Sequence, residues 1–490
     1  MKHISRRTFV RNSALALGAA GLAYRGASSV WAQPSGSNDA VRIGIIGLGW
    51  KGGDHLKDLL TKSAARVVAL CDVDPEILAR QVEVARAGRA EVFATTDPRR
   101  LLERNDVDAV VIATPNHWHA LLTVWACQAG KDVYVEKPVS HSVWEGTKMV
   151  EAAQRYGRVV QSGTQTRSDH MIPQWQRYIR EGHTGKVQWI HAVTYKMRPN
   201  IGLRQPWLPA WLDYDLYCGP AQKNALRRDK LHYDWHWSWE TGNGDLANLG
   251  VHQLDIAAWL TGQESMPRRI LSLGGRYVHD DAAQTPNLQI TVLDYPDVPM
   301  IFENRGLPAK PGVNYFDHVR GCREGIIVQC ENGYFTGYHG GAFFDHDGKR
   351  VKQFEGDGGA KHMGNFLEAV RSRKPAMLAA PIATGHRSTA KCLYGNISYR
   401  VGRPAPFAQV REAVSSLPFV VEALENARAH LQVHGADLEQ KPLTVGPWLY
   451  PDSKDGIERV EGAGGDDVLA ASRQLLRDPM REGYRIPDKV

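Results

Sequence analysis

The feature that most constrains this fold is a glycine-rich turn that joins a short apolar strand to a helix. Residues 41–46 read VRIGII, a β-branched run typical of a buried strand, and GLGWKG follows at residues 47–52. In the pattern GxGxxG the first glycine permits a tight turn, the second lets the backbone approach a diphosphate, and the third lets helix and strand pack closely. The turn therefore predicts a helix whose N-terminus faces phosphate groups.

A carboxylate stands where this type of turn needs one. Asp72 ends the second predicted strand, 20 residues after Gly52. At that place it can accept hydrogen bonds from the ribose hydroxyls of a dinucleotide, and it would repel a 2′-phosphate. We therefore expect NAD, with NADP less favoured. Lys51 is a cation in the same loop that could tolerate the extra phosphate.

Strands and helices alternate regularly through residues 41–165. Helical stretches of ten to fifteen residues between short apolar strands predict a parallel, doubly wound sheet, that is, a Rossmann dinucleotide-binding domain. The predicted strands are 41–46, 66–71, 109–113, 132–135 and 159–162, and the predicted helices are 75–87, 119–129 and 143–156.

The pattern changes after Gln165. Longer alternating segments at 187–195, 269–277, 288–293 and 300–302 predict a large mixed or antiparallel sheet, interrupted by helices at 246–260 and 363–371. We expect an α+β domain for substrate and oligomer contacts over residues 166–405. A C-terminal extension, 406–490, contains a predicted helix at 418–432, and its function does not follow from its sequence.

The first residues are typical of an export signal. SRRTFV at residues 5–10 is a twin-arginine pattern, residues 14–23 are apolar, and Val30-Trp31-Ala32 has the small residues of a cleavage site. We expect a signal peptide at 1–32, a tether at 33–40 and an exported, periplasmic protein. The signal holds five cations and no acid, so its removal lowers the net charge from +7 to +2. This charge gives no reason to expect nucleic acid.

Six cysteines without a CxxC spacing indicate neither a disulfide scaffold nor a zinc site, although a bridge among Cys218, Cys322, Cys330 and Cys392 stays open. Cys71 and Cys127 stand in apolar runs and are expected in the core. No second apolar run is long enough to span a bilayer, so we expect no stable membrane anchor once the signal is removed.

Three motifs together resemble the glucose-fructose oxidoreductase, inositol dehydrogenase and MocA (Gfo/Idh/MocA) family. They are ATPNHWH at 113–119, EKP at 136–138 and GNGDLANLGVHQLD at 242–255. The triplet EKP is weak alone, but it comes directly after the predicted strand 132–135, and together with the other two motifs it strengthens the resemblance. It covers about residues 41–400.

The resemblance implies a nicotinamide lying between the two domains. Lys137 would face the oxygen of the reacting carbon, where a cation lowers the barrier to carbonyl formation. The residues that the turn and the resemblance place against the cofactor are Gly47, Leu48, Gly49, Gly52, Asp72, Thr114, Pro115, Asn116, His119, Glu136 and Lys137.

His252 is the expected general base, because its ordinary pKa lies near neutrality. On a helix over 246–260, Asn248, His252 and Asp255 would share one face. The family's dehydrogenases usually have Asp four residues before the histidine, and this chain has Asn248. An amide can orient the imidazole but cannot offset its charge, unless Asp255 or Asp245 supplies it.

Other polar and aromatic residues could contribute. Tryptophans alternate through WHWSW at 235–239, with Trp207 and Trp211 upstream, and could stack on a sugar ring or belong to the core. The pairs His232/His236 and His117/His119 lack the further ligands that a metal site needs, so we expect no metal.

These observations predict an NAD(P)-dependent oxidoreductase that acts on a hydroxyl or carbonyl of a sugar, polyol or glycoside, with a tightly bound cofactor. One alternative is a redox-neutral glycoside-cleaving enzyme, which needs another base, for which Asp255, Tyr195 or His191 could serve. Another is a non-catalytic sugar-binding protein that keeps NAD. The resemblance also suggests a homodimer or homotetramer that pairs through the open face of the second sheet.

Overall fold

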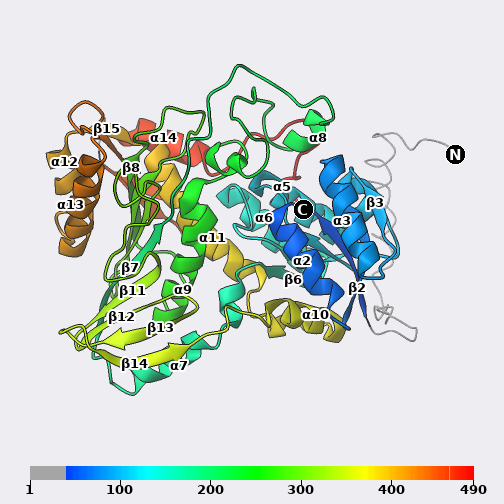
Figure 1. Ribbon diagram of the computed structural model, residues 1–490, viewed down its shortest axis with the longest axis horizontal. Coiled ribbons are helices and arrows are strands. Elements are labelled where there is room, and N and C mark those ends of the chain that lie inside the picture. Colours follow the sequence, from blue (N-terminus) through cyan, green and yellow to red (C-terminus); the bar gives the residue numbers. More distant parts are fainter. Residues whose placement is uncertain (1–39, 463) are drawn as a thin grey trace. The chain divides into compact units, whose positions relative to one another are not determined.

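The computed structural model of the chain describes residues 40–462 and 464–490 (Figure 1). The expected signal, 1–32, and residues 33–39 of the expected tether lie outside the described residues. Residues 41–490 belong to one unit built on two sheets.

The first sheet is six-stranded and parallel, in the order β3-β2-β1-β4-β5-β6. β4 and β5 are buried along their whole length, as expected for a sheet covered by helices on both faces. The predicted Rossmann domain is confirmed. Its elements are β1 Val41–Ile46, α2 Trp50–Leu60, β2 Ala65–Cys71, α3 Pro75–Ala87, β3 Phe93–Thr95, α4 Pro98–Leu102, β4 Ala109–Ile112, α5 Asn116–Gln128, β5 Asp132–Val135, α6 Val143–Arg155 and β6 Val160–Ser162.

The second sheet is twelve-stranded and mixed, which confirms the predicted class of the second domain. Its main path is β14-β13-β12-β11-β7-β10-β9-β8-β16-β15, and β17 pairs with β8 and β18. The strands are β7 Val187–Tyr195, β8 Arg269–Gly275, β9 Leu288–Asp294, β10 Met300–Arg305, β11 Glu324–Cys330, β12 Gly333–Gly337, β13 Gly340–Phe344, β14 Arg350–Glu355, β15 Arg403–Ala405, β16 Leu443–Val445, β17 Trp448–Pro451 and β18 Ile457–Glu461.

Two helices separate the two sheets (Figure 1). α9, Val251–Thr261, packs on β7 and β10, and α11, Ile382–Arg400, lies between α6 and β8. Both helices are buried on nearly every side, because each has a sheet or a helix around it. The predicted helix at 246–260 begins instead with a π turn, Leu246–Gly250. The remaining helices are α7 Met171–Arg180, α8 Tyr214–Cys218, α10 His362–Ser372, α12 Phe407–Glu412, α13 Pro418–Val433 and α14 Gly465–Gln474.

The residues after 405 extend the second sheet and cover its outer face. β16 and β17 pair with β8, and apolar residues of α12 and α13 pack against the outward side chains of β8, β9 and β10. The following tail returns to the Rossmann domain: the ring of Tyr484 lies 5.6 Å from that of Trp118, and Asp478 accepts from Nδ1 of His141 at 2.6 Å. This extension therefore joins both sheets.

All six cysteines lie in described parts of the chain, and each is buried and free, so the disulfide that the sequence left open does not form in this structure. Among the helices of residues 40–462 and 464–490, none is long and apolar enough to cross a membrane.

Candidate active site

The glycine loop after β1 has the shape that a diphosphate requires. Gly47 has φ of +83°, and a Cβ there would lie 2.7 Å from the backbone of Ala113 and Thr114. A Cβ on Gly52 would lie 1.9 Å from the carbonyl oxygen of Gly47. Above Gly49, by contrast, no atom of the described chain lies within 4 Å of the Cβ position. Packing therefore requires glycine at positions 47 and 52, whereas Gly49 leaves the backbone open to a ligand.

The N-terminus of α2 is available to an anion. Gly49 is its N-cap, and within the described chain no side chain caps the first turn and no acid lies in it. The N–H groups of a first helical turn lack intrahelical partners, and the helix dipole favours negative charge there. The loop therefore fits the diphosphate of a dinucleotide.

Asp72 lies beside this loop, at the end of β2. Its carboxylate accepts from the N–H of Leu48 at 2.6 Å and from the N–H of Asp74 at 2.9 Å. Burial raises the pKa of the Asp72 carboxyl, although these two N–H groups oppose the shift. The two bonds fix the carboxylate beside the phosphate cradle, and an acid there suits the free 2′-hydroxyl of NAD.

The residues of the ATPNHWH motif hold the loops around the site. Asn116 donates to Oδ1 of Asn243 at 3.1 Å and so bridges the two domains. His119 places one ring nitrogen 2.7 Å from the carbonyl of Pro138 and the other 2.8 Å from that of Thr114. Both nitrogens of His119 face protein carbonyls, so its role here is to position these loops. Thr114 keeps a buried hydroxyl that has no partner among the described residues.

Glu136 is the buried anion of the site. Its carboxylate lies 2.8 Å from Nε2 of His55 and accepts from the amide of Gln165 at 2.8 Å. Burial alone would raise its pKa, but the hydrogen bond from His55 and the nearby charges of Lys51 and Lys137 outweigh burial and lower it. Glu136 therefore stays ionised beside Lys137.

Lys137 reaches across to the second domain. Its Nζ donates to the carbonyl oxygen of Asn248 at 2.7 Å and lies 3.4 Å from Oδ1 of the same residue. Asn248 belongs to the π turn, a wide helical turn that is frequent at functional sites. Burial lowers the pKa of Lys137 to about 8, with Glu136 opposing the shift. The lysine is thus placed and poised to gain or lose a proton near neutral pH.

His252 lies in the first turn of α9, buried beside the ring of Tyr338 at 6.4 Å. Burial and the positive charge of Lys137 lower its pKa well below the ordinary value. Its buried Nδ1 has no hydrogen-bond partner within the described chain. The imidazole is therefore neutral at pH 7 with a ring nitrogen open to a ligand, and the lowered pKa makes it a weaker base than a free histidine.

The two carboxylates that were expected to support His252, Asp255 and Asp245, form ion pairs with arginines instead. Asp255 accepts two hydrogen bonds from Arg167, each 2.8 Å long, and one from Ser388. Asp245 accepts from Nε of Arg198 at 2.9 Å in a second two-bond pair. Asn248 serves Lys137 rather than the imidazole. The structure therefore brings Lys137, Asn248 and His252 together and leaves Asp255 in a separate ion pair.

The other two predicted bases, His191 and Tyr195, lie on the opposite face of the second sheet. Nε2 of His191 and the hydroxyl of Tyr195 lie 2.9 Å and 2.7 Å from the carboxylate of Glu303. Their positions on β7 alternate with those of Ile190 and Ala192, whose side chains join the core that faces α9. Neither group can reach His252.

The tryptophans of residues 235–239 do not form one sugar-binding face. Trp235 and Trp237 lie within a short 3-10 turn, Asp234–Trp237, and Trp239 comes just after it, so the three do not lie on an extended strand. Trp237 is buried under the guanidinium of Arg198 at 4.8 Å, and Trp239 contacts Arg400. Trp235 stacks on His236 at 3.6 Å. Their contacts are mostly with other protein side chains.

Sequence reasoning missed the hairpin between β12 and β13. Its turn presents Tyr338 and His339 to the site, and the charge of His339 contributes to the lowered pKa of His252. These residues stand in a glycine-rich stretch with no motif, 86 and 87 positions after His252. Only the pairing of the strands brings them there.

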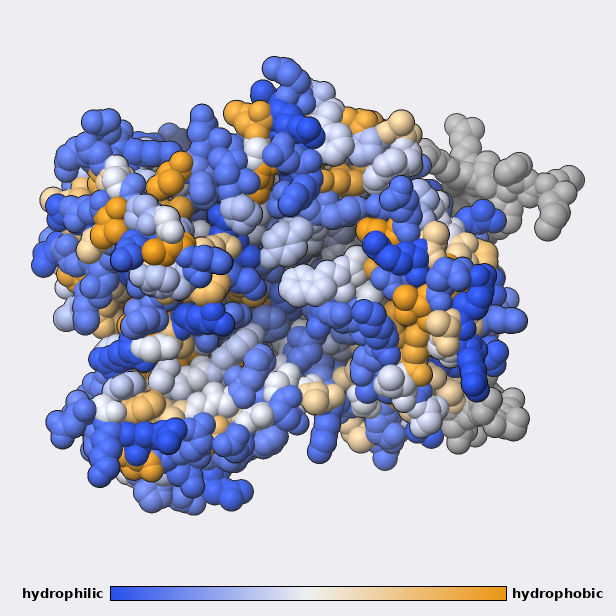
Figure 2. Space-filling view, in the orientation of Figure 1, coloured by the Kyte–Doolittle hydropathy of each residue, from blue (hydrophilic) through white to orange (hydrophobic). Residues whose placement is uncertain are grey.

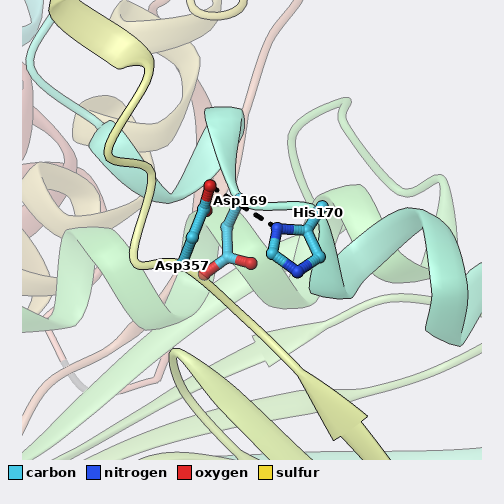
Figure 3. A group of neighbouring side chains, drawn as sticks. All are labelled: Asp169, His170 and Asp357. Atoms are coloured by element: carbon cyan, nitrogen blue, oxygen red, sulfur yellow. Dashed lines mark ion pairs between the residues drawn. The ribbon is translucent and has the colours of Figure 1, made fainter.

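One group of side chains has the composition of a metal site (Figure 3). Asp169 accepts from the N–H of Met171 and of Gly358, both at 2.8 Å, and Asp357 lies 3.5 Å from Nδ1 of His170. The Asp169 bonds begin α7 and hold the loop after β14. The group is accounted for as a junction between these two loops.

Figure 2 shows a hollow between the Rossmann domain and the second sheet, lined largely by hydrophilic side chains. The glycine loop, Lys137 and His252 come from elements on either side of this junction. A buried cation and a neutral histidine beside a diphosphate cradle can place a hydroxyl-bearing carbon and take up its proton.

Comparisons with known proteins agree with this geometry. Residues 41–164 match the Gfo/Idh/MocA oxidoreductase family, NAD-binding Rossmann fold, and residues 177–310 match its C-terminal alpha/beta domain. Inositol 2-dehydrogenase 2 of Saccharopolyspora erythraea is 31% identical over 226 residues, which cover 46% of this chain and 55% of that protein. A glycosyl hydrolase family 109 protein of Solibacter usitatus is 36% identical over 168 residues, 32% of this chain and 38% of that protein.

The chain spans about half the length of the curated relatives that it matches. A solved structure, the WlbA dehydrogenase of Bordetella pertussis in complex with NADH and UDP-GlcNAcA, superimposes with a TM-score of 0.53 at 18% identity. The superposition covers 73% of this chain and 96% of that one, which shows a shared fold. With its NAD-binding Rossmann domain followed by the matching alpha/beta domain, the chain belongs to the Gfo/Idh/MocA oxidoreductase family.

Proposed function

We propose that this protein transfers a hydride between tightly bound NAD and a hydroxyl-bearing carbon of a sugar, polyol or glycoside. The observation that supports this most directly is the meeting of Lys137 and His252 beside the glycine loop. The Lys137 ammonium is held at 2.7 Å by the Asn248 carbonyl, and the buried His252 keeps a ring nitrogen without a partner in the described chain. Relatives that include an inositol dehydrogenase support a polyhydroxylated substrate.

The two side chains divide the work at the substrate oxygen. Oxidation of an alcohol carbon releases a proton from its hydroxyl as the carbonyl forms. His252, neutral at pH 7, accepts that proton, and Lys137 stabilises the charge that develops on the oxygen. When bound, the nicotinamide takes or returns the hydride. Asp72 and the glycine loop hold the adenosine and diphosphate part.

The direct test is the absorbance of the purified protein in the reduced-nicotinamide band. We expect NAD to co-purify, and a free sugar or polyol that is a substrate to reduce it in place. A panel of chromogenic glycosides, incubated in parallel, reports cleavage. Finding no nucleotide in the supernatant of the heat-denatured protein would refute tight cofactor binding.

A second candidate is a redox-neutral glycoside-cleaving reaction, favoured by Asn248 and by the glycosyl hydrolase family 109 relatives. Such an enzyme oxidises a ring hydroxyl to a ketone, removes a proton from the neighbouring carbon and expels the aglycone, which leaves a carbon–carbon double bond. Water then adds across that double bond, and the hydride returns to the ketone. It needs one more base. Asp255, His191 and Tyr195 are held in other contacts, whereas the ring of Tyr338 lies 6.4 Å from that of His252. His339, the next residue, lies 3.8 Å from Asp169 and its charge acts on His252. We assign the extra proton transfer to this hairpin.

The Asn248→Asp variant separates the two reactions. A carboxylate at this position raises the basicity of His252 and pairs with Lys137. If net oxidation is native, turnover of free sugars stays equal or rises. If elimination is native, cleavage of the chromogenic glycoside falls. A protein that retains NAD yet leaves every sugar and glycoside unchanged would instead be a non-catalytic sugar-binding protein.

We also propose that the chain is exported by the twin-arginine route, on the motif at residues 5–10. Replacing Arg6 and Arg7 with Lys should keep the protein in the cytoplasm of a host with this pathway. Fractionation with equal periplasmic amounts of both forms would contradict export by this route.

For the oligomer we propose a homodimer or homotetramer. α12 and α13 cover the outer face over β8–β10. Pairing would therefore use the side of β7 and β11–β14. Light scattering on the eluting protein tests this, and a monomer at micromolar concentration contradicts it.

A further inference from the structure

Residues 199–241, here called the cover segment, leave the second domain after β7 and return at the π turn. The segment packs against the end of β2 in the Rossmann domain. Val73, the residue after Asp72, contacts an apolar cluster of the segment whose buried members are Leu212, Tyr217, Cys218, Leu226 and Leu231. This small core places the cover segment beside the adenosine side of the dinucleotide site.

A polar contact ties the cover segment to the same place. Nε2 of His232 lies 2.7 Å from Oδ2 of Asp74, while the N–H of Asp74 donates to Asp72. His232 is therefore linked through Asp74 to Asp72, the carboxylate expected at the ribose. Because the His232 side chain is 49% exposed, solvent screening weakens this contact. The apolar cluster therefore contributes most of the attraction between the cover segment and the Rossmann domain.

Tyr233, the next residue, has a backbone conformation that needs a reason. Its φ and ψ are +64° and −50°, and the N–H of Asp234 donates to the carbonyl of His232 at 2.8 Å. This is the rare, strained form of the γ-turn. Strain of this kind persists where surrounding contacts over-determine it, which is frequent at functional sites.

The turn directs the Tyr233 ring toward the glycine loop. Its ring centre lies 6.3 Å from that of Trp50, the first residue of α2, and Trp50 is 74% exposed. The indole contacts Tyr233 and is otherwise largely exposed at the phosphate end of the helix. Trp50 follows Gly49 directly in the chain, so its indole and the neighbouring Tyr233 ring stand next to the part of the loop where the backbone is open.

Tyr233 is also linked to the catalytic helix. Its hydroxyl accepts from Nη1 of Arg198 at 2.7 Å, and Arg198 forms the two-bond pair with Asp245, directly before the π turn. The same guanidinium lies over Trp237. The cover segment is thus held from the cofactor side and from the substrate side.

We propose that the cover segment encloses the bound dinucleotide, with Trp50 and Tyr233 closing over its diphosphate and His232 beside its adenosine ribose, so that NAD remains in place through many turnovers. The proposal rests on the proposed function, since it concerns the same cofactor. These residues position and retain the cofactor and take no part in proton transfer.

The test measures how fast NAD leaves. Protein loaded with labelled NAD is chased with excess unlabelled NAD, and the retained label is followed over time. We expect Tyr233→Gly and Trp50→Ala each to speed release tenfold or more, and His232→Ala about threefold. Because the two rings close one opening, the double variant should release NAD more slowly than the product of the single effects predicts.

Stability separates retention from damage to the fold. Glycine accepts φ of +64° without strain, and this relief offsets the lost hydrogen bond from Arg198, so Tyr233→Gly should melt within a few degrees of wild type when both are free of cofactor. Arg89→Gly is the matched control, because Arg89 is exposed and also has positive φ, at +63°. Tyr315→Ala, at a 52% exposed ring, controls for Trp50→Ala. Both controls should release NAD as wild type does.

The outcomes are distinct. If wild type retains the label and Tyr233→Gly and Trp50→Ala release it within twofold of wild type, the cover is refuted and the proposed function stands. If wild type binds no NAD, the proposed function itself fails.

Discussion

The two faces of the second sheet treat buried polar groups in opposite ways. On the outer face, Glu303 is fully buried and accepts from His191, Tyr195 and Arg305, and Arg305 pairs in turn with Asp317. Toward the Rossmann domain, the described chain gives His252 Nδ1 no partner. On the outer face the buried charges neutralise one another and serve the fold, although Nη2 of Arg305 also lacks a partner in the described chain. The neutral ring of His252 belongs to no such network, so its free nitrogen is available to a ligand.

The difference follows from the free energy of buried charge. Removing one member of a closed buried network leaves the others uncompensated and costs about 3 to 5 kcal/mol of stability. Removing a positioned acid-base group from a cleft loses about 10² or more in rate, and it leaves stability nearly unchanged where no other protein group depends on it. The comparison therefore predicts that variants on the two faces will separate stability from turnover.

The largest effect is expected for Glu303→Gln on the outer face. It leaves Arg305 without a neutralising partner on one side, so the free energy of unfolding should fall by about 3 kcal/mol, the low end because Asp317 still pairs with Arg305. Urea unfolding measures this, with Glu422→Gln on the exposed side of α13 as control. Turnover per folded molecule should stay at the wild-type value, and a loss of turnover would break the comparison.

Next come Lys137→Ala and His252→Ala on the inner face. Each should lower turnover by roughly 10² or more, because each removes a group that acts on the substrate oxygen. Bound NAD should stay near the wild-type level in both variants. The melting temperature of His252→Ala should also stay near wild type, because Nδ1 of His252 has no partner in the described chain, whereas Lys137→Ala should melt lower because it loses the hydrogen bond to the Asn248 carbonyl and a charge beside Glu136. If both variants turn over every active substrate at the wild-type rate, the site is placed wrongly.

A smaller effect tests the cofactor end separately from the chemistry. Asp72→Ser removes the carboxylate that disfavours a 2′-phosphate, so the preference for NAD over NADP should fall about tenfold, the scale of one charged contact. Competition between the two nucleotides measures the ratio. An unchanged ratio would show that Asp72 does not lie at the ribose.

The smallest effect is a pH dependence. The pKa of Lys137 is lowered to about 8, so its cation is present at pH 7 and is lost as pH rises through 8. The rate should fall roughly fourfold between pH 7 and pH 8.5. His252, with a pKa well below its ordinary value, stays neutral over this range and gives no acidic limb above pH 6. The residual activity of Lys137→Ala should lack the basic limb, and a retained limb would assign it to another group.

Much of the first domain could be predicted because its signals are local. β1, α3 and β5 begin and end where the apolar runs, Pro75 and the following glycines indicate. β11 to β14 could not, since these strands contain several glycines and exposed residues and are defined by pairing with distant segments. The glycine loop could be predicted by motif, because there the backbone shape itself is the signal, whereas Lys137 was predicted from the EKP triplet of the family resemblance and its role stays a prediction.

The partners of the acids could not be predicted, because they lie far along the chain. Arg167 is 88 residues from Asp255, and Arg198 is 47 residues from Asp245. A helical period places Asp255 near His252 in sequence but cannot show that a buried guanidinium already holds it. A hydrophobic period of 3.6 residues likewise cannot indicate the π turn, in which the Asn248 carbonyl accepts a hydrogen bond from Lys137.

The tail at 476–490 has a consequence for synthesis. His141, in the loop before α6, pairs with Asp478, which is synthesised 337 residues later. Tyr484, Ile486 and Val490 complete the apolar core around Trp118. At 5–20 residues per second a ribosome needs roughly 20 to 70 s to make that stretch. During this time the first domain has its nucleotide loop but an open flank. Chains interrupted before the tail would expose this flank, which would mark them for chaperones or proteases.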